Sequence, residues 1–125
     1  MLLLDERLPC GPDAARRARE RIATLEPRLP QNTLEDVTLL VSELVTNAYR
    51  HAGLSDGEPI ELRVSRDGST VRIEVIDPGN TSRPRIRENA VEGGWGLRIV
   101  EQLAARWGTE SDPKGTRVWL ELESV

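Results

Sequence analysis

The feature that most constrains the fold is a change in the spacing of apolar residues along the chain. After Thr33, apolar side chains recur every three or four residues, at Leu34, Val37, Val41, Leu44, Ala48 and Ala52. At about 100° per residue they fall on one face of a helix. The sequence therefore predicts an amphipathic helix from Thr33 to about Ala52. Thr33 and Asp36 have the spacing of a capping box, and Gly53 is typical of a helix end.

Beyond this helix the spacing of apolar residues falls to two, which predicts strands. Three segments alternate in this way, and their apolar positions are Ile60, Leu62 and Val64, then Val71, Ile73 and Val75, then Val118, Leu120 and Leu122. Between the first two segments, Arg66-Asp67-Gly68 predicts a hairpin turn, because Asp-Gly tolerates the positive φ that tight turns need.

Three further segments complete the predicted order of elements. Residues 2–4 predict a short edge strand, and residues 12–25 predict a helix that Pro27 and Pro30 end. Residues 96–107 predict a second amphipathic helix. Because the strands form hairpins and do not alternate strictly with helices, we expect an α+β fold. This fold is a two-layer sandwich with a mixed or antiparallel sheet and helices on one face.

Length and composition narrow the classes of function. The 125 residues suit one domain, residues 1–125. The net charge of −4 argues against general nucleic-acid binding. The single cysteine, Cys10, excludes an internal disulfide and a cysteine-cluster metal site. No apolar run approaches the ~20 residues of a membrane span, and charged residues follow Leu4 at once, unlike a signal peptide. We expect a cytoplasmic protein that contacts neither membrane nor nucleic acid directly.

Glu43 and Asn47 form the first candidate functional pair. They are four residues apart, so they lie one above the other at the rim of the predicted helix's apolar face. A carboxylate that activates a hydroxyl, and an amide oxygen that meets a cation, both suit this half-buried position. In the alternative interpretation, both are solvated residues of the helix surface.

Asp77 is the second candidate. It continues the two-residue register of the preceding strand, which predicts that its carboxylate points inward, toward the helix layer. Pro78-Gly79 then ends the strand and lets the backbone approach a ligand. In the alternative interpretation, Asp77 caps the turn formed by residues 77–80.

The third candidate is the Gly-Gly-Trp-Gly run at residues 93–96, directly before the second predicted helix. Its backbone N–H groups and the helix N-terminus suit a phosphate, although a flexible hinge would also use these glycines. In the loop before it, Arg83, Arg85 and Arg87 either grip a phosphate or lie in solvent. His51 has no second ligand at metal spacing and is interpreted as a helix-end residue.

Taken in order, these motifs resemble those of the GHKL ATP-binding superfamily, which includes gyrase, chaperone, histidine kinase and mismatch-repair ATPases. The similar segments are residues 43–51 (the N-box), 77–80 and 94–97 (the two glycine boxes) and Gly115-Thr116 (the closing Gly-Thr motif). The resemblance spans residues 12–123. Residues 41–48 most resemble the bacterial anti-sigma-factor serine kinases.

The resemblance implies a Bergerat-type ATP-binding fold with ATP and Mg²⁺ as cofactors. Glu43 would be the catalytic base that takes the proton from an attacking serine. Asn47 would bind ATP and hold Mg²⁺, and Asp77 would accept a hydrogen bond from the adenine amino group. The further ATP-binding residues would be Arg50, Gly79, Gly94, Gly96, Leu97 and Thr116.

The resemblance also implies an ATP-binding serine protein kinase that acts as an anti-sigma factor. It would phosphorylate an anti-anti-sigma (STAS-type) partner, sequester a sigma factor and form a homodimer. Asn80, where a second glycine is usual, and Glu92-Gly93, where a basic residue is common, favour an alternative: a nucleotide-responsive protein-binding module without phosphotransfer. A third interpretation, a histidine-kinase catalytic domain, needs an upstream phospho-accepting His, and the 42 residues before Glu43 contain none.

Overall fold

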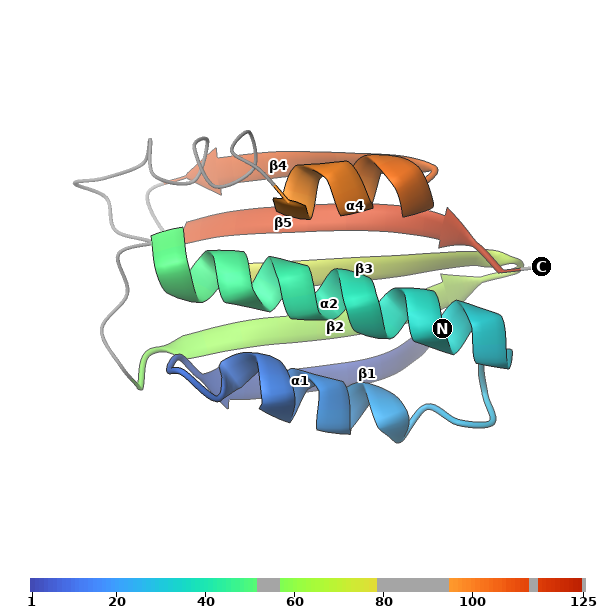
Figure 1. Cartoon of the computed structure of the whole chain (residues 1–125), viewed down its shortest axis with the longest axis horizontal. Helices are drawn as coiled ribbons and strands as arrows, with labels where there is room; N and C mark the ends of the chain where they lie inside the picture. Colours follow the sequence, from blue (N-terminus) through green and yellow to red (C-terminus); the bar gives the residue numbers. More distant parts are fainter. Residues whose placement is uncertain (52–56, 79–94, 113–114, 125) are drawn as a thin grey trace.

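The computed structural model describes residues 1–51, 57–78, 95–112 and 115–124. They form two layers, a β-sheet and a set of helices that covers one face of it (Figure 1). The helices are α1 (Ala14–Ala23), α2 (Gln31–His51) and α4 (Trp95–Leu103). In this part of the chain, no helix has the length and apolar character that crossing a membrane requires.

The sheet is antiparallel throughout. Its strands are β1 (Leu2–Pro9), β2 (Pro59–Asp67), β3 (Thr70–Asp77), β4 (Arg106–Asp112) and β5 (Gly115–Glu123). They lie in the order β1-β2-β3-β5-β4, and each neighbouring pair runs antiparallel. The predicted α+β two-layer sandwich is confirmed, and of the two sheet types expected, the structure has the antiparallel one.

The hairpin between β2 and β3 lies where the sequence predicts it. Asp67 pairs with Thr70, and Gly68 in the turn between them has a φ of 62°. Positive φ is the conformation that glycine adopts without steric cost. The edge strand β1 extends beyond the predicted residues 2–4, and α1 lies within the predicted range 12–25.

Helix α4 ends earlier than the sequence predicts. The predicted helix spans residues 96–107, whereas α4 ends at Leu103 and Trp107 lies in β4, opposite Leu120. The N–H of Ala105 donates to a carbonyl oxygen of β5 at 2.7 Å, so the chain joins the sheet directly after the helix. Trp107 has helical spacing from the residues before it, but strands favour half-buried aromatic residues equally well.

The start of α2 also differs from the prediction. The capping box is wrong, because α2 begins at Gln31 and the N–H of Leu34 donates to the carbonyl oxygen of Pro30 at 2.9 Å. Thr33 therefore lies inside the helix. Its side chain is buried, and its hydroxyl lies 3.0 Å from the hydroxyl of Ser124. This contact ties α2 to the end of the sheet, and no local spacing signals it.

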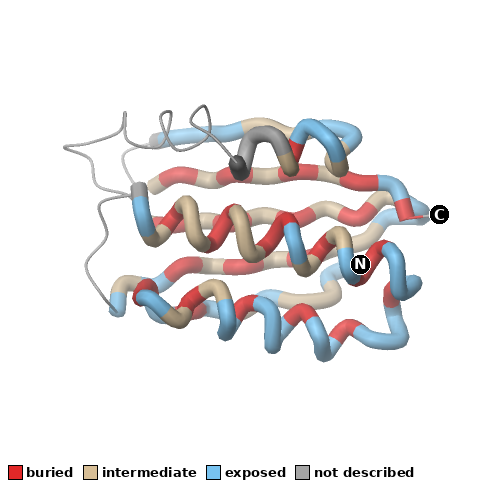
Figure 2. The backbone as a smooth tube through the Cα atoms, in the orientation of Figure 1, coloured by how far each residue is buried: buried red, intermediate tan, exposed pale blue. Residues whose placement is uncertain are grey.

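The core lies between the helices and the inward face of the sheet, and buried positions alternate with less buried ones along the central strands (Figure 2). The predicted stripe on α2 is buried at Leu34, Val37, Val41, Leu44 and Ala48. Every predicted inward strand residue from Ile60 to Leu122 is buried as well. Because successive strand residues point to opposite faces, this register also decides where the residues at the strand ends point.

The sheet face that α1, α2 and α4 leave uncovered carries a charged cluster around Trp119. Arg72 donates to one carboxylate oxygen of Glu121 at 3.0 Å, and Arg106 lies 2.6 Å from the other. The Arg72 guanidinium stacks 4.6 Å from the centre of the Trp119 ring. A Cβ on Gly108 would lie 2.9 Å from the indole, so glycine lets the ring lie against β4.

The two arginines lower the pKa of Glu121. Burial alone raises this pKa, but hydrogen bonds from Arg72 and Arg106, together with their charges, outweigh burial and hold the pKa below its ordinary 4.5. A depressed pKa in the folded state means that the ionised group stabilises the fold. This stabilisation is complete above the unfolded-state pKa and is lost as the pH falls through the folded-state pKa.

We therefore predict that Glu121→Gln lowers the free energy of unfolding near neutral pH by about 1 kcal/mol, because the charge-assisted hydrogen bonds are lost. The difference from wild type should shrink below about pH 4.5, where the wild-type carboxylate also becomes protonated. Urea unfolding followed by circular dichroism from about pH 7 to about pH 3 measures this. The exposed Glu110, 3.5 Å from Arg117, provides the control Glu110→Gln. A difference that stays constant with pH would contradict the prediction.

Candidate functional site

Asp77, the last residue of β3, is almost completely buried, with 1% of its surface exposed. It continues the inward series Val71, Ile73 and Val75, so its carboxylate lies on the face that the helices cover. The predicted inward register is confirmed. The alternative, in which Asp77 caps the turn of residues 77–80, stays open, because residues 79 and 80 lie outside the described residues. Pro78 follows directly and lies outside the strand.

Thr116 lies beside Asp77. The two residues are register partners on β5 and β3, and Thr116 is also buried. Directly opposite residues of an antiparallel pair place their side chains on the same face, with Cβ atoms about 5 Å apart. A carboxylate and a hydroxyl therefore stand together at the end of the inward face of the sheet.

Gly115 makes this pairing sterically feasible. Its φ is 156°, and a Cβ at this position would overlap the carbonyl oxygen of Asp77. The start of β5 can thus approach the end of β3 closely only if residue 115 has no side chain. The sequence singled out Gly115-Thr116 by resemblance alone, and the structure gives the glycine a steric reason.

Ser111 is a polar neighbour of this site that the sequence analysis missed. It lies on β4 opposite Thr116, and the two hydroxyl oxygens are 3.4 Å apart. Antiparallel pairing with β5 would have identified Ser111, but the spacing of apolar residues does not predict β4.

On α2, Glu43 and Asn47 are half-buried, as their place at the rim of the apolar face predicts. Leu44 and Ala48, each one residue further along, are buried in the core. The pair is thus partly covered and partly open to solvent, so the catalytic role and the alternative of two solvated residues of the helix surface both stay predictions. Arg50, in the last turn of α2, is exposed.

The elements that carry the predicted residues converge toward one end of the molecule (Figure 1). The C-terminal ends of α2 and β3 and the N-terminal end of β5 lie there, and α4 directs its N-terminus toward it. Gly96 and Leu97 belong to the first turn of α4, where the helix dipole favours an anion. Several predicted residues lie outside the described residues: Gly79, Asn80, Arg83, Arg85, Arg87, Glu92, Gly93 and Gly94.

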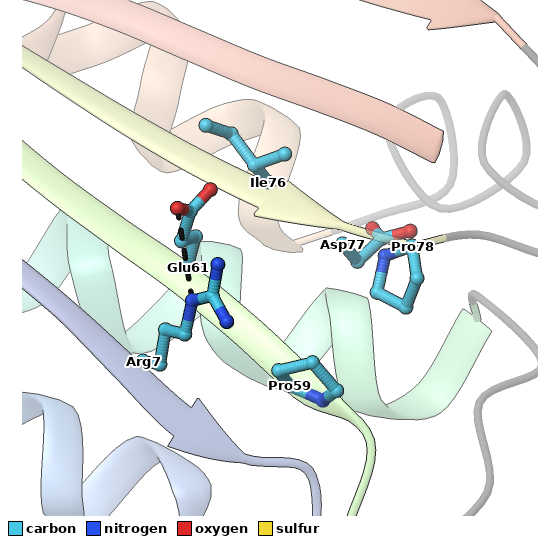
Figure 3. A pocket seen from close by; sticks show the side chains of 6 residues that line it. All are labelled: Arg7, Pro59, Glu61, Ile76, Asp77 and Pro78. Atoms are coloured by element: carbon cyan, nitrogen blue, oxygen red, sulfur yellow. Dashed lines mark ion pairs between the residues drawn. The ribbon is translucent and has the colours of Figure 1, made fainter. Parts of the chain in front are cut away.

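A cavity of about 200 Å³ opens beside Asp77 (Figure 3). It is lined by Arg7, Pro59, Glu61, Ile76, Asp77 and Pro78. Arg7 and Glu61 form an ion pair of 4.0 Å at its wall. Glu61 and Ile76 are register partners on the uncovered face, so this cavity approaches Asp77 from the side opposite α2. Glu43 and Asn47 do not line it.

The two-layer arrangement, the antiparallel sheet and the order of the motifs define the class of protein as a GHKL-type ATPase domain. A comparison with protein families agrees. Residues 8–122, nearly the whole chain, match the family described as the histidine kinase-like ATPase domain. The chain belongs to this family.

Among solved structures, the chain is similar to the blue-light activated histidine kinase of Erythrobacter litoralis EL346. The TM-score is 0.57 at 22% sequence identity, and the match covers 93% of this chain and 42% of that chain. This likeness supports the fold, and the chain spans less than half the length of that kinase. No curated protein matches the chain significantly.

We predict that Gly115→Ala destabilises the domain by about 2–3 kcal/mol, because the added Cβ overlaps the backbone of Asp77 and forces β5 away from β3. Gly68→Ala is the control, since Gly68 also has positive φ but nothing lies within 4 Å of the position that a Cβ would take there. That variant should lose about 1 kcal/mol. Urea unfolding measures both, and equal losses would show that conformational strain, and not the close approach, is the cause.

Proposed function

We propose that this chain binds ATP with Mg²⁺ and is a serine protein kinase that acts as an anti-sigma factor. It phosphorylates an anti-anti-sigma (STAS-type) partner and sequesters a sigma factor. The observation that supports nucleotide binding best is the buried carboxylate of Asp77 beside Thr116. The half-buried pair Glu43 and Asn47 on the helix that covers the sheet supports the transfer step.

Asp77 selects the base in this proposal. A carboxylate accepts hydrogen bonds and donates none, so it pairs with the exocyclic amino group of adenine. Guanine has a carbonyl oxygen at the corresponding position, which would face the carboxylate oxygen without a proton between them. Because Asp77 is buried, an unfavourable pairing is not relieved by water. The site therefore prefers ATP to GTP.

Asn47 fits a magnesium ion that the nucleotide brings with it. Among the described residues, no group of three or more His, Cys, Asp or Glu side chains could hold a metal ion. Mg²⁺ commonly keeps several waters and takes few protein ligands alongside substrate phosphates. The amide oxygen of Asn47 suits such a single protein ligand, and the bound ion would supply charge neutralisation of the triphosphate.

Glu43 takes the proton in the transfer step. It lies one helical turn before Asn47 on the same side of α2, so base and metal ligand share one rigid element. The serine oxygen of the partner attacks the γ-phosphorus, and its proton passes to the Glu43 carboxylate. The bond from the γ-phosphorus to the β–γ bridging oxygen breaks, and ADP leaves.

We predict that Asp77→Asn weakens ATP binding at least about tenfold, because the amide replaces a charge-assisted acceptor with a neutral one. The preference for ATP over GTP should fall as well. Isothermal titration calorimetry with each nucleotide and Mg²⁺ measures both effects. Asp67→Asn, at an exposed position of the β2–β3 hairpin, is the matched control and should bind like wild type. Unchanged ATP affinity in Asp77→Asn would refute the assigned role.

Glu43→Gln should reduce phosphotransfer at least about 100-fold, since a positioned general base contributes that much or more. ATP affinity should stay within about threefold of wild type, because the base acts in the transition state. Transfer of labelled phosphate from Mg·ATP to a purified STAS-type protein, with phosphoserine identified by mass spectrometry, measures the rate. Glu101→Gln, at an exposed position of α4, is the control. A Glu43→Gln variant with wild-type transfer would contradict the assignment.

The same assay separates the two candidate functions. Phosphotransfer by the wild-type chain supports the kinase. Tight ATP binding with nucleotide-dependent capture of the STAS-type protein or a sigma factor, but no phosphoserine, supports the alternative of a nucleotide-responsive binding module. The altered sequence at Asn80 and Glu92-Gly93 is the feature that favours this alternative.

A further inference from the structure

Three polar side chains form a row across the end of the sheet that carries the proposed nucleotide site. Strands β4, β5 and β3 lie side by side (Figure 1). Ser111 on β4 is the register partner of Thr116 on β5, and Thr116 is in turn the register partner of Asp77 on β3. Directly opposite residues of an antiparallel pair point to the same face of the sheet. The three side chains therefore share the face on which the helices lie.

Exposure to solvent rises along this row. Asp77 and Thr116 are buried, whereas Ser111 is exposed. The hydroxyl oxygens of Ser111 and Thr116 are 3.4 Å apart, and by distance alone either hydroxyl can be the donor. Water can reach the Ser111 hydroxyl, but the buried Thr116 hydroxyl depends on neighbouring side chains or on a ligand for its hydrogen-bond partners.

The groups on the other side of Thr116 decide the direction of this contact. A hydroxyl has one proton to donate, and its oxygen accepts further hydrogen bonds. Asp77, as a carboxylate, only accepts, and in the proposed site it accepts from the amino group of adenine. The neighbouring ring atom of adenine, N1, is an acceptor as well. The Thr116 proton therefore belongs on the side of Asp77 and the base, and the Thr116 oxygen is left to accept from Ser111.

We propose that Ser111 is a positioning residue for recognition of the base. Ser111 donates to Thr116, Thr116 donates to N1 of adenine, and Asp77 accepts from the amino group next to N1. The inference rests on the proposed binding of ATP. It adds to that proposal a residue on a third strand that does not touch the nucleotide and acts through Thr116.

Cooperativity gives this row its effect. A hydroxyl that accepts one hydrogen bond is polarised and donates another more strongly. The contact with Ser111 therefore strengthens the bond from Thr116 to the base. The row also disfavours guanine, because N1 of guanine carries a proton and would meet a donating hydroxyl. Ser111 thus adds to the preference for ATP over GTP that Asp77 provides.

Isothermal titration calorimetry of the full chain with Mg²⁺ and either ATP or 1-deaza-ATP, in which a C–H group replaces N1, tests the proposal. Ser111→Ala should weaken ATP binding about three- to tenfold, the range for one neutral hydrogen bond. 1-Deaza-ATP offers Thr116 no acceptor, so wild type and Ser111→Ala should bind it with affinities within about 1.5-fold of each other. A loss confined to ATP is the signature of action through N1.

Two further variants serve as controls. Ser111→Thr keeps the hydroxyl and should bind ATP within about twofold of wild type; a loss as large as that of Ser111→Ala would contradict a role of the hydroxyl. Thr109→Ala removes another exposed hydroxyl from the same face of β4, opposite Val118, and should bind both nucleotides like wild type. Thermal unfolding by circular dichroism verifies that each variant is folded.

Two results would overturn the role of Ser111 and leave the proposed function in place, provided that wild type binds ATP and Asp77→Asn binds it more weakly. In the first, Ser111→Ala binds ATP as wild type does. In the second, Ser111→Ala weakens ATP and 1-deaza-ATP by the same factor, which would show that Ser111 only supports the pairing of β4 with β5. A wild-type chain that binds no ATP would instead refute the proposed function and this inference together.

Discussion

The packing of α2 against the inward face of the sheet is the interaction on which the rest of the structure depends. Val37, Val41 and Val45 on the helix are fully buried, as are Leu62 and Ile73 on the strands beneath. This contact fixes how α2 is rotated about its axis, because the apolar stripe must face the sheet. The rotation in turn places residues next to the stripe at its rim, which is where the Glu–Asn pair lies.

The same register explains why a carboxylate is buried at the end of β3. Along this strand the inward positions are apolar, and an apolar residue at position 77 would extend the core without the cost of desolvating a charge. Asp77 therefore does not improve the packing of the core. Its burial, 1% exposed beside Thr116, agrees with the proposed role in recognising a ligand, and Gly115 permits the close approach of the two strands.

The sequence was sufficient for the elements whose spacing repeats. Residues Leu34 to Ala48 and the inward positions of β2, β3 and β5 follow simple periods, and Asp77 could be placed by counting in twos. β4 could not be predicted, because its edge position leaves Thr109 and Ser111 polar and exposed, and Trp107 fits a helical period as well. Thr33 was misassigned because its partner hydroxyl is 91 residues away along the chain.

Helix α2 also connects the proposed nucleotide site with the groove that it forms with α1, since Glu35 and Leu39 line that groove and precede Glu43 and Asn47 on the helix. Coupling between such surfaces requires an element with two packed arrangements of similar energy. The buried face of α2 offers none: Val37, Leu40 and Val41 have no exposed surface, and a shift of one residue would rotate them away from the sheet. The tight packing of this face makes the helix a rigid support for both surfaces.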